Sequence, residues 1–375
     1  MPQKDKSQEN PSAFKLWIND RVVTKIAKAI ESEYPSFKTN EFKKLSKQLD
    51  PLELKGRVLL ITAELKKHLP DDYKKSLSIL VKAMEKGDLT GFELWPFSEY
   101  ISQFGLDHFD DSLKAMYKLT QRFTSEWAVR PFLLKDHKKV LNILSKWTDD
   151  KSVHVRRWIS EGTRPLLPWG QRIPLFVMDP THTILFLDKL RHDEELYVRK
   201  SVANHLNDIA KNHPQVVIDV LRMWSKDVPT EHQDKINWIK RHALRTLIKK
   251  GHPGALKLMG VDGKADVELG KVTLNQKKFK LHDKLTFEFT VTSTSKKKQK
   301  IVVDYAIDFV KANGKKGKKV YKLKSFDLGP NEEITLKKSH SLRPITTMKY
   351  YSGIHHLMIQ VNGEMMDKKD FFLEI

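Results

Sequence analysis

Residues that could take part in chemistry occur together in the segment 153–172, VHVRRWISEGTRPLLPWGQR. Arg157 and Glu161 have the i, i+4 spacing of one helix face, opposite a stripe of apolar side chains. Prolines and glycines in the second half of the segment stop the helix and form a short rigid connection. Two cations and a large aromatic residue follow on this connection: Arg164, Arg172 and Trp169. A carboxylate near such a group indicates a functional site.

The chain as a whole is strongly basic. It has 375 residues, a formal net charge of +21 and a sequence pI near 9.7, which favours a polyanionic partner such as nucleic acid or an anionic membrane. The alternative is that the lysines only keep the chain soluble and that it has no such partner. No apolar run approaches the roughly 20 residues of a membrane span, so we expect no membrane association and a cytoplasmic protein. The absence of cysteine excludes disulfides and thiolate ligands.

The first two thirds of the chain show helical periodicity. Apolar residues recur at helical spacing in 14–36, 52–68, 76–86 and 92–101. A short stretch that begins with an apolar or aromatic residue, contains a branched apolar residue and ends in a cation then recurs, and its last three copies end at Arg156, Arg199 and Arg241. These arginines are 43 and 42 positions apart, which predicts an α-solenoid of HEAT-like helical repeats.

The polar faces of these repeats carry both cations and carboxylates. In the helix expected over 194–210, Lys200, Asn204 and Asp208 lie opposite the apolar stripe. The corresponding faces of neighbouring repeats carry two further pairs, Arg130 with Glu126 and Arg157 with Glu161. If the solenoid turns these faces to one side, they form a basic groove with carboxylates on its floor. The alternative is that each pair is an ordinary i, i+4 ion pair worth tenths of a kcal/mol.

The composition changes between residues 251 and 264, where glycine and proline end the helical region. Alternating or β-branched runs at 284–292, 300–309, 334–338 and 354–361 then predict about seven strands in a β-sandwich of immunoglobulin-like type. We therefore expect three parts: a disordered tail at 1–12, a helical domain at 13–259 and a sandwich at 260–375.

The expected sandwich is the more basic part of the chain. Residues 264–375 contain 23 Lys plus Arg against 13 Asp plus Glu, a net charge of +10, which leaves +11 for the preceding 263 residues. Two lysine runs, 296–300 and 315–319, contribute to this excess. They either solubilise loops or contact phosphates and help the sandwich to clamp a polyanionic partner.

Several chemistries lack their motifs. The sequence has no phosphate-binding Gly-x-x-x-x-Gly-Lys loop, no His-Glu-x-x-His zinc helix and no strand followed by a glycine-rich dinucleotide turn. His355 and His356 are adjacent in an expected strand and point to opposite faces, so they are poor joint metal ligands. We expect no metal, no nucleotide cofactor and no other cofactor.

Four stretches resemble a known family, the bacterial DNA alkylation repair glycosylases of the AlkC type. They are SEWAVRPF at 125–132, HVRR at 154–157, SEGTRP with LPW at 160–169, and YVRKSVANHLND at 197–208. The resemblance implies a HEAT-like solenoid, in some members followed by an immunoglobulin-like domain. It also implies a monomeric, monofunctional N-glycosylase of base excision repair. Such an enzyme removes cationic bases, chiefly 3-methyladenine and 3-methylcytosine, from duplex DNA and leaves an abasic site without full base flipping.

Carried over residue by residue, the resemblance implies a catalytic set and a DNA-binding set. The catalytic set is Glu126, Glu161 and Trp169, with Asp208 as a further candidate. The DNA-binding set is Arg130, Arg156, Arg157, Arg164, Arg172, Lys200 and Asn204. The expected partner is alkylated double-stranded DNA in the bacterial nucleoid.

Two other functions fit part of the same sequence. A non-catalytic repeat scaffold that binds nucleic acid would explain the charge and the repeats, but not carboxylates on a basic face. A phosphodiesterase would need metal ligands that the sequence lacks.

Overall fold

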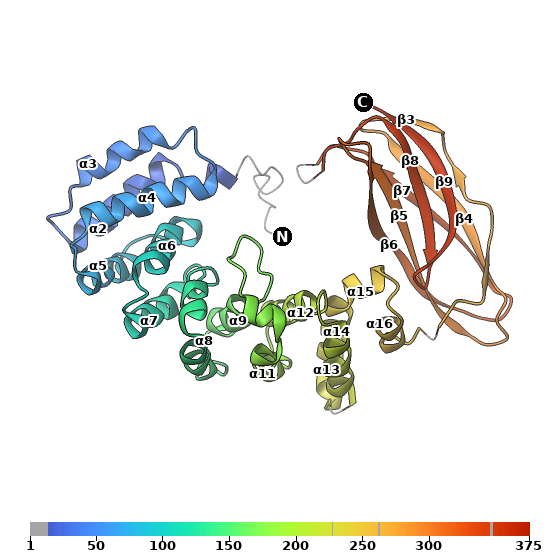
Figure 1. Ribbon diagram of the computed structural model, residues 1–375, viewed down its shortest axis with the longest axis horizontal. Helices are drawn as coiled ribbons and strands as arrows, with labels where there is room; N and C mark the ends of the chain where they lie inside the picture. Colours follow the sequence, from blue (N-terminus) through green and yellow to red (C-terminus); the bar gives the residue numbers. More distant parts are fainter. Residues whose placement is uncertain (1–13, 227, 262, 346–347) are drawn as a thin grey trace. The chain divides into compact units, whose positions relative to one another are not determined.

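The computed structural model describes residues 14–226, 228–261, 263–345 and 348–375 (Figure 1). Helices form the first part of the chain and strands the second. The helices are α2 (Asp20–Glu33), α3 (Thr39–Lys43), α4 (Leu54–His68), α5 (Tyr73–Lys86), α6 (Trp95–Phe104), α7 (Phe109–Thr120), α8 (Val129–Ser145), α9 (Val153–Gly162), α10 (Pro174–Met178), α11 (Thr181–Leu190), α12 (Leu196–Ile209), α13 (Pro214–Lys226), α14 (Gln233–Ala243), α15 (Arg245–Lys249) and α16 (Pro253–Leu258), with the 3-10 turns η2 (Lys44–Gln48), η3 (Gly91–Leu94) and η4 (Thr230–His232).

Contacts divide the chain into two compact units. The first contains the described residues up to Asn212 together with Asp234–Ile239, and the second contains His213–Gln233 and the described residues from Lys240 onward. Helices α13, α15 and α16 thus group with the strands. The domain limit that the sequence indicates at 259/260 stays a prediction, and the tail expected at 1–12 lies outside the described residues.

Helices of the first unit stack in pairs that bury the apolar faces predicted from the sequence. Figure 1 shows α4 beside α6 and α9 beside α12, and both pairs are in contact. On α2, the side chains of Val23, Ile26 and Ile30 are fully buried, and Asn19 caps the helix by accepting from Val22 N at 3.2 Å. The predicted helices are confirmed, although each begins or ends a few residues from its expected limit.

Helix α9 begins at Val153 and ends at Gly162, as the sequence predicts. Its apolar stripe, Val155, Trp158 and Ile159, is fully buried. Gly162 allows a close approach to α8, because a Cβ at this position would lie 2.9 Å from Val129 Cγ1. The chain then enters the connection 163–173, which leads to α10.

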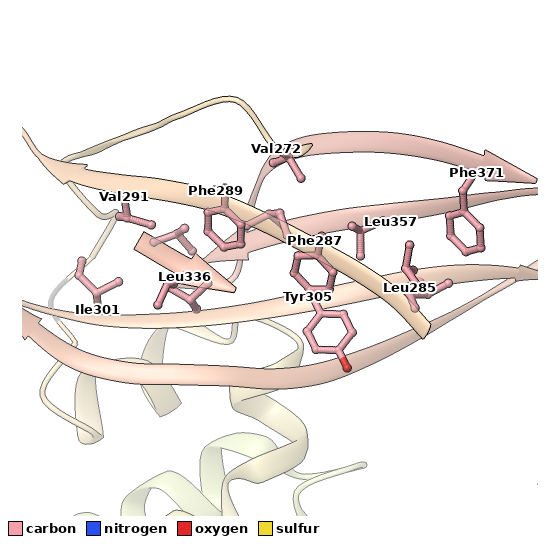
Figure 2. Close-up of a cluster of buried hydrophobic side chains, with 14 of the residues drawn as sticks. Val272, Leu285, Phe287, Phe289, Val291, Ile301, Tyr305, Leu336, Leu357 and Phe371 are labelled. Carbon is pink, nitrogen blue, oxygen red and sulfur yellow. The ribbon is translucent and has the colours of Figure 1, made fainter. Parts of the chain in front are cut away.

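In the second unit, two sheets pack face to face as a sandwich. The strands are β1 (Val267–Leu269), β2 (Thr273–Leu274), β3 (Lys278–Lys280), β4 (Lys284–Ser293), β5 (Gln299–Val310), β6 (Lys316–Leu328), β7 (Glu333–Ser341), β8 (Gly353–Val361) and β9 (Glu364–Glu374). One sheet has the order β1-β4-β2 with β7 also paired to β4, and the other has the order β3-β9-β8-β5-β6. Figure 2 shows the apolar core between them, with Phe287 and Tyr305 in contact at a ring distance of 5.1 Å.

The lysine run at 315–319 does not lie in a loop, contrary to one reading of the sequence. From Lys316 it belongs to β6, which pairs with β5 along its whole length. Farther along this strand, Tyr321 and Leu323 pack toward the core while Lys322 and Lys324 are exposed. The density of lysine hid this alternation, because the apolar positions are outnumbered by charged ones.

Within the second unit, the last helices pack directly on a sheet. Leu256 and Val261 form a small buried cluster with Val302 of β5. Gly251 and Gly363 touch through their backbones, both with positive φ, and a Cβ on Gly363 would lie 2.2 Å from Gly251 Cα. Glycine is required at both positions, because no side chain fits between the two backbones. No helix among the described residues is long and apolar enough to cross a membrane.

Candidate functional site

Three predicted carboxylates come together from three different parts of the helical unit. Glu126 lies in the turn before α8, Glu161 is the penultimate residue of α9, and Asp208 is the penultimate residue of α12. They are 7%, 6% and 2% exposed. Buried carboxylates need charged or hydrogen-bonding partners, because burial penalises the ionised form.

Cations alternate with these carboxylates in a single row. Arg157 is bonded to Glu126 and lies 3.5 Å from Glu161 Oε1. Arg164 Nη1 lies 2.6 Å from Glu161 Oε1, and its Nη2 lies 2.7 Å from Asp208 Oδ2. Lys211 completes the row, 2.9 Å from Asp208 Oδ1. We call these six residues the charge row: Glu126, Arg157, Glu161, Arg164, Asp208 and Lys211.

Two hydroxyl groups also hold the carboxylates. Ser201 Oγ donates to Glu161 Oε2 at 2.6 Å, and Thr124 Oγ1 donates to Glu126 Oε2 at 2.9 Å. Neither residue was predicted from the sequence. For Ser201 a signal existed, since it lies seven residues before Asp208 and therefore two turns away on the same helix face.

The electrostatics of the row differ between its members. Burial raises the pKa of Glu126 above its usual 4.5, and the nearby charge of Glu161 adds to this, while Arg157 acts in the opposite direction. Burial lowers the pKa of Arg157, but attraction to Glu126 and Glu161 outweighs it, and the pKa is raised. The arginine thus stays charged, and Glu126 is protonated more readily than an ordinary glutamate.

Trp169 projects from the connection 163–173 and is 72% exposed. Its φ of +60° is unusual for a side chain of this size and costs about 1–2 kcal/mol. Its indole lies nearly parallel to that of Trp95, with ring centroids 6.3 Å apart, and 6.4 Å from the ring of Trp127. The sequence placed Trp169 on this connection but did not indicate its neighbours Trp95 and Trp127.

We call Trp95, Trp127 and Trp169 the aromatic wall. Trp95 and Trp169 also line a cavity of about 440 Å³, together with Phe14, Leu54 and Lys55. Lys55 Nζ lies 5.4 Å from the centroid of the Trp95 ring, in position for a cation–π interaction. Trp127, next in sequence to Glu126, connects this aromatic wall to the charge row.

Arg130 was expected to contact phosphate and to pair with Glu126, and its surroundings contradict both expectations. Its side chain is 0% exposed, and its guanidinium donates to backbone carbonyls of Gly162 and Arg164, both at 2.9 Å, and of Gln171. It therefore cannot contact a phosphate in this conformation. The expected i, i+4 pair with Glu126 does not form either, because the ion pair of Glu126 is made with Arg157.

Three other arginines of the expected DNA-binding set are already engaged. Arg157 and Arg164 are largely buried within the charge row, so we correct their role from gripping phosphate to holding carboxylates. Arg156 donates to both oxygens of Asp193, from Nε at 2.6 Å and from Nη2 at 3.0 Å, and is held in that pair. Arg172 and Lys200 are exposed and Asn204 is half-buried, so a phosphate contact by these three stays a prediction.

The arrangement can stabilise positive charge that develops beside it. Carboxylates fixed by arginines and hydroxyls need no reorganisation when such charge appears, and in a partly dry site they act more strongly than in water. In the described parts of the chain, no group of three or more His, Cys, Asp or Glu residues could hold a metal ion.

Two family models match parts of the chain. A family model described as "DNA alkylation repair enzyme" matches residues 120–247, and a model described as "Uncharacterised protein YhaZ, C-terminal Ig-like domain" matches residues 268–375. The uncharacterized protein YhaZ of Bacillus subtilis (strain 168) is 40% identical over 355 residues, which cover 94% of this chain and 97% of YhaZ.

A solved structure is similar over nearly the whole length. It is the Pseudomonas fluorescens alkylpurine DNA glycosylase AlkC bound to DNA containing an abasic site analog. It is 36% identical, with a TM-score of 0.89, and the match covers 96% of this chain and 99% of that one. The chain therefore belongs to the family of DNA alkylation repair proteins that includes AlkC, with a helical region followed by an immunoglobulin-like domain.

Proposed function

We propose that this protein is a monofunctional DNA glycosylase that removes cationic alkylated bases, chiefly 3-methyladenine and 3-methylcytosine, from duplex DNA and leaves an abasic site. The carrying observation is the pair of buried carboxylates, Glu126 and Glu161, joined by Arg157 and adjoining an aromatic wall that ends in the exposed Trp169. Membership in a DNA alkylation repair family supports the same activity.

The chemistry follows from the charge of the substrate. Methylation at N3 makes the base a cationic leaving group, so the N-glycosidic bond can break with its electron pair going to the base without prior protonation. Positive charge then develops on the deoxyribose, and a carboxylate against the sugar stabilises it. Water forms the new bond to C1′ and gives its proton to a carboxylate or to solvent. The products are a neutral methylated base and an abasic site.

The contacts favour different roles for the three carboxylates. Glu161 accepts from Arg164 and Ser201 and also lies near Arg157, so its charge is the more strongly fixed. We assign to it the electrostatic stabilisation of the sugar. Glu126 has a raised pKa, and both of its hydrogen bonds, from Thr124 and Arg157, go to the same oxygen, which suits a group that orients water and takes its proton. Asp208 is bonded on both oxygens and serves as the anchor of Arg164.

Trp169 would act at the face of the sugar. An exposed indole attracts positive charge through its ring face. Because Trp169 lies at the surface, we propose that the lesion is reached without full rotation of the nucleotide into an enclosed pocket. Arg172, Lys200 and the lysines of the sandwich would contact phosphates, and a monomer would act on DNA in the bacterial nucleoid.

The test is single-turnover release of free 3-methyladenine and 3-methylcytosine from alkylated duplex DNA in the presence of EDTA. We expect the native protein to release both. Glu161→Gln should keep the fold and the affinity for abasic DNA but lose release by roughly 10²- to 10³-fold. Glu231→Gln, at an exposed carboxylate of η4, is the matched control and should leave release unchanged.

Two results would contradict the proposal. Binding to alkylated duplex without release of base would favour the non-catalytic scaffold. Strand cleavage that requires added metal would favour a nuclease.

A further inference from the structure

Arg130 is a cation in the interior of the helical unit. Its side chain is 0% exposed, and its hydrogen bonds go to three backbone carbonyls. Within the described residues, no carboxylate lies within 4.0 Å of its guanidinium, whereas Arg157 and Arg164 each have such a partner. A buried charge persists only where several acceptors fix it, so these carbonyls must hold a defined position.

The three carbonyls enclose one segment of chain. Gly162 O lies at the end of α9, and the carbonyls of Arg164 and Gln171 lie within the connection 163–173. Arg130 Nη1 bonds the first two and its Nε bonds the third, so a single planar group ties both ends of this connection together. Among the residues that the structure describes, none forms a hydrogen bond with its Nη2.

Trp169 lies between these fixed points. The residue before it is held by Trp127, whose Nε1 donates to Pro168 O at 3.2 Å. The residue after it, Gly170, packs on the stem of Arg130, because a Cβ there would lie 3.1 Å from Arg130 Cδ. Trp169 itself has a positive φ, which is strained, and an exposed ring, which makes few contacts. Its conformation therefore depends on the neighbouring residues that hold the chain on either side of it.

We propose that Arg130 is a positioning residue that holds Trp169 beside Trp95 and Trp127. It acts through the connection 163–173 and touches neither the DNA nor the reacting atoms. The role of Trp169 at the sugar rests on the proposed glycosylase function, but its positioning by Arg130 does not. A lysine cannot replace Arg130, because one ammonium at the end of a flexible stem cannot reproduce the planar fork that bonds three carbonyls.

The first experiment is a double-mutant cycle with Arg130→Lys and Trp169→Ala. Arg130→Lys should slow single-turnover excision by about 100-fold, as expected for a misplaced catalytic group. In the Trp169→Ala background, adding Arg130→Lys should change the rate by less than roughly twofold, because the group that Arg130 positions is already absent. Fully additive losses would overturn the proposal.

Salt dependence separates positioning from phosphate contact. Loss of a phosphate contact lowers the slope of log affinity against log salt concentration by about 1. Arg130→Lys should leave this slope unchanged for abasic duplex DNA. A slope reduced to the same extent as in Arg172→Ala would contradict our inference.

The position of Trp169 can be observed without activity. In protein labelled with 5-fluorotryptophan, the ¹⁹F resonance of Trp169 is identified by its absence from Trp169→Phe. Arg130→Lys should shift or broaden this resonance, while that of Trp147, which packs on Tyr117 and Trp158 in the same unit, stays in place and reports an intact fold. An unchanged Trp169 resonance would refute the positioning role. If the native protein releases no base, the proposed function fails while this measurement still tests Arg130.

A second variant guards against loss of folding in Arg130→Lys. Gly170→Ala keeps the cation and presses a methyl group against its stem, so it should move the same ¹⁹F resonance. A folded Gly170→Ala protein with a native Trp169 resonance would count against the proposal.

Discussion

Arg164 contacts a single oxygen of Asp208 with two nitrogens: Nε donates to Oδ2 at 2.8 Å, and Nη2 lies 2.7 Å from the same oxygen. The other oxygen accepts from Lys211 at 2.9 Å. Both oxygens of a carboxylate that is 2% exposed are therefore engaged. This geometry ties the connection after α9 to the end of α12 and is better suited to holding Arg164 than to meeting a substrate.

We predict that Asp208→Asn mainly destabilises the protein. Removing one charge from a buried pair leaves Arg164 partly uncompensated and should lower the free energy of unfolding by about 3 kcal/mol. Excision should fall by about tenfold, far less than in Glu161→Gln. Urea unfolding and single-turnover release measure the two effects. A stable Asp208→Asn protein with excision as slow as that of Glu161→Gln would show instead that Asp208 takes part in the chemistry.

The pKa of Glu126 gives the excision rate an acidic limb. Since burial raises this pKa above 4.5, the reactive anion is lost at a higher pH than for an ordinary glutamate. Release of 3-methyladenine should fall as the pH drops through the raised pKa, and the slow residual release of Glu126→Gln should be flat over the same range. An identical limb in that variant would assign the titration to another group.

The raised pKa of Glu126 also makes the free energy of unfolding depend on pH. The native state binds the Glu126 proton more tightly than the unfolded state does, so the free energy of unfolding falls as pH rises from about 4.5 to the raised pKa. Compared with Glu126→Gln over this interval, the native protein should therefore lose stability as pH rises. A relative gain would mean that Arg157 outweighs burial at this carboxylate.

Arg172 and Lys200 are exposed and are predicted to contact phosphates. Alanine at either position should weaken binding to abasic and undamaged duplex alike and lower the salt slope by about 1. Arg222→Ala, an exposed arginine paired with Asp219 at 2.6 Å, is the control and should change neither quantity. Fluorescence anisotropy at several salt concentrations measures the slopes, and unchanged slopes for both variants would place the DNA elsewhere.

The contact between Gly251 and Gly363 predicts a sensitive position outside the candidate site. Alanine at Gly363 would place its Cβ 2.2 Å from Gly251 Cα at a φ of +84°, so the helices of the second unit must move away from the sheet. We expect a loss of about 1–3 kcal/mol in the free energy of unfolding. Gly314→Ala, also at positive φ but with open space around it, controls for backbone strain alone. Equal losses in the two variants would show that the contact itself contributes nothing.

Patterns of neighbouring residues in the sequence predicted the helices and strands of this fold well. They predicted poorly which side chains meet when helices that are distant in sequence pack together. The limits of α9 and the place of Trp169 on the connection after it follow from apolar spacing and from prolines and glycines near in sequence. The partner of Glu126 does not, because Arg157 lies 31 residues away and reaches it only when two repeats stack. From the i, i+4 spacing, the expected ion-pair partner of Glu126 was Arg130, four residues along the chain. Burial then changed the roles of the arginines, since a cation on a polar helix face can point into a neighbouring repeat as easily as toward DNA.

The charge row also determines what a DNA strand meets at this place. The formal charges of its three carboxylates and three cations sum to zero within a chain that carries +21. In the proposed function, a phosphate would be neither repelled by the row nor drawn to it, while exposed cations such as Arg172 and Lys200 would attract the backbone. Because the row has no net formal charge, a sugar could approach it without a phosphate competing for the same position.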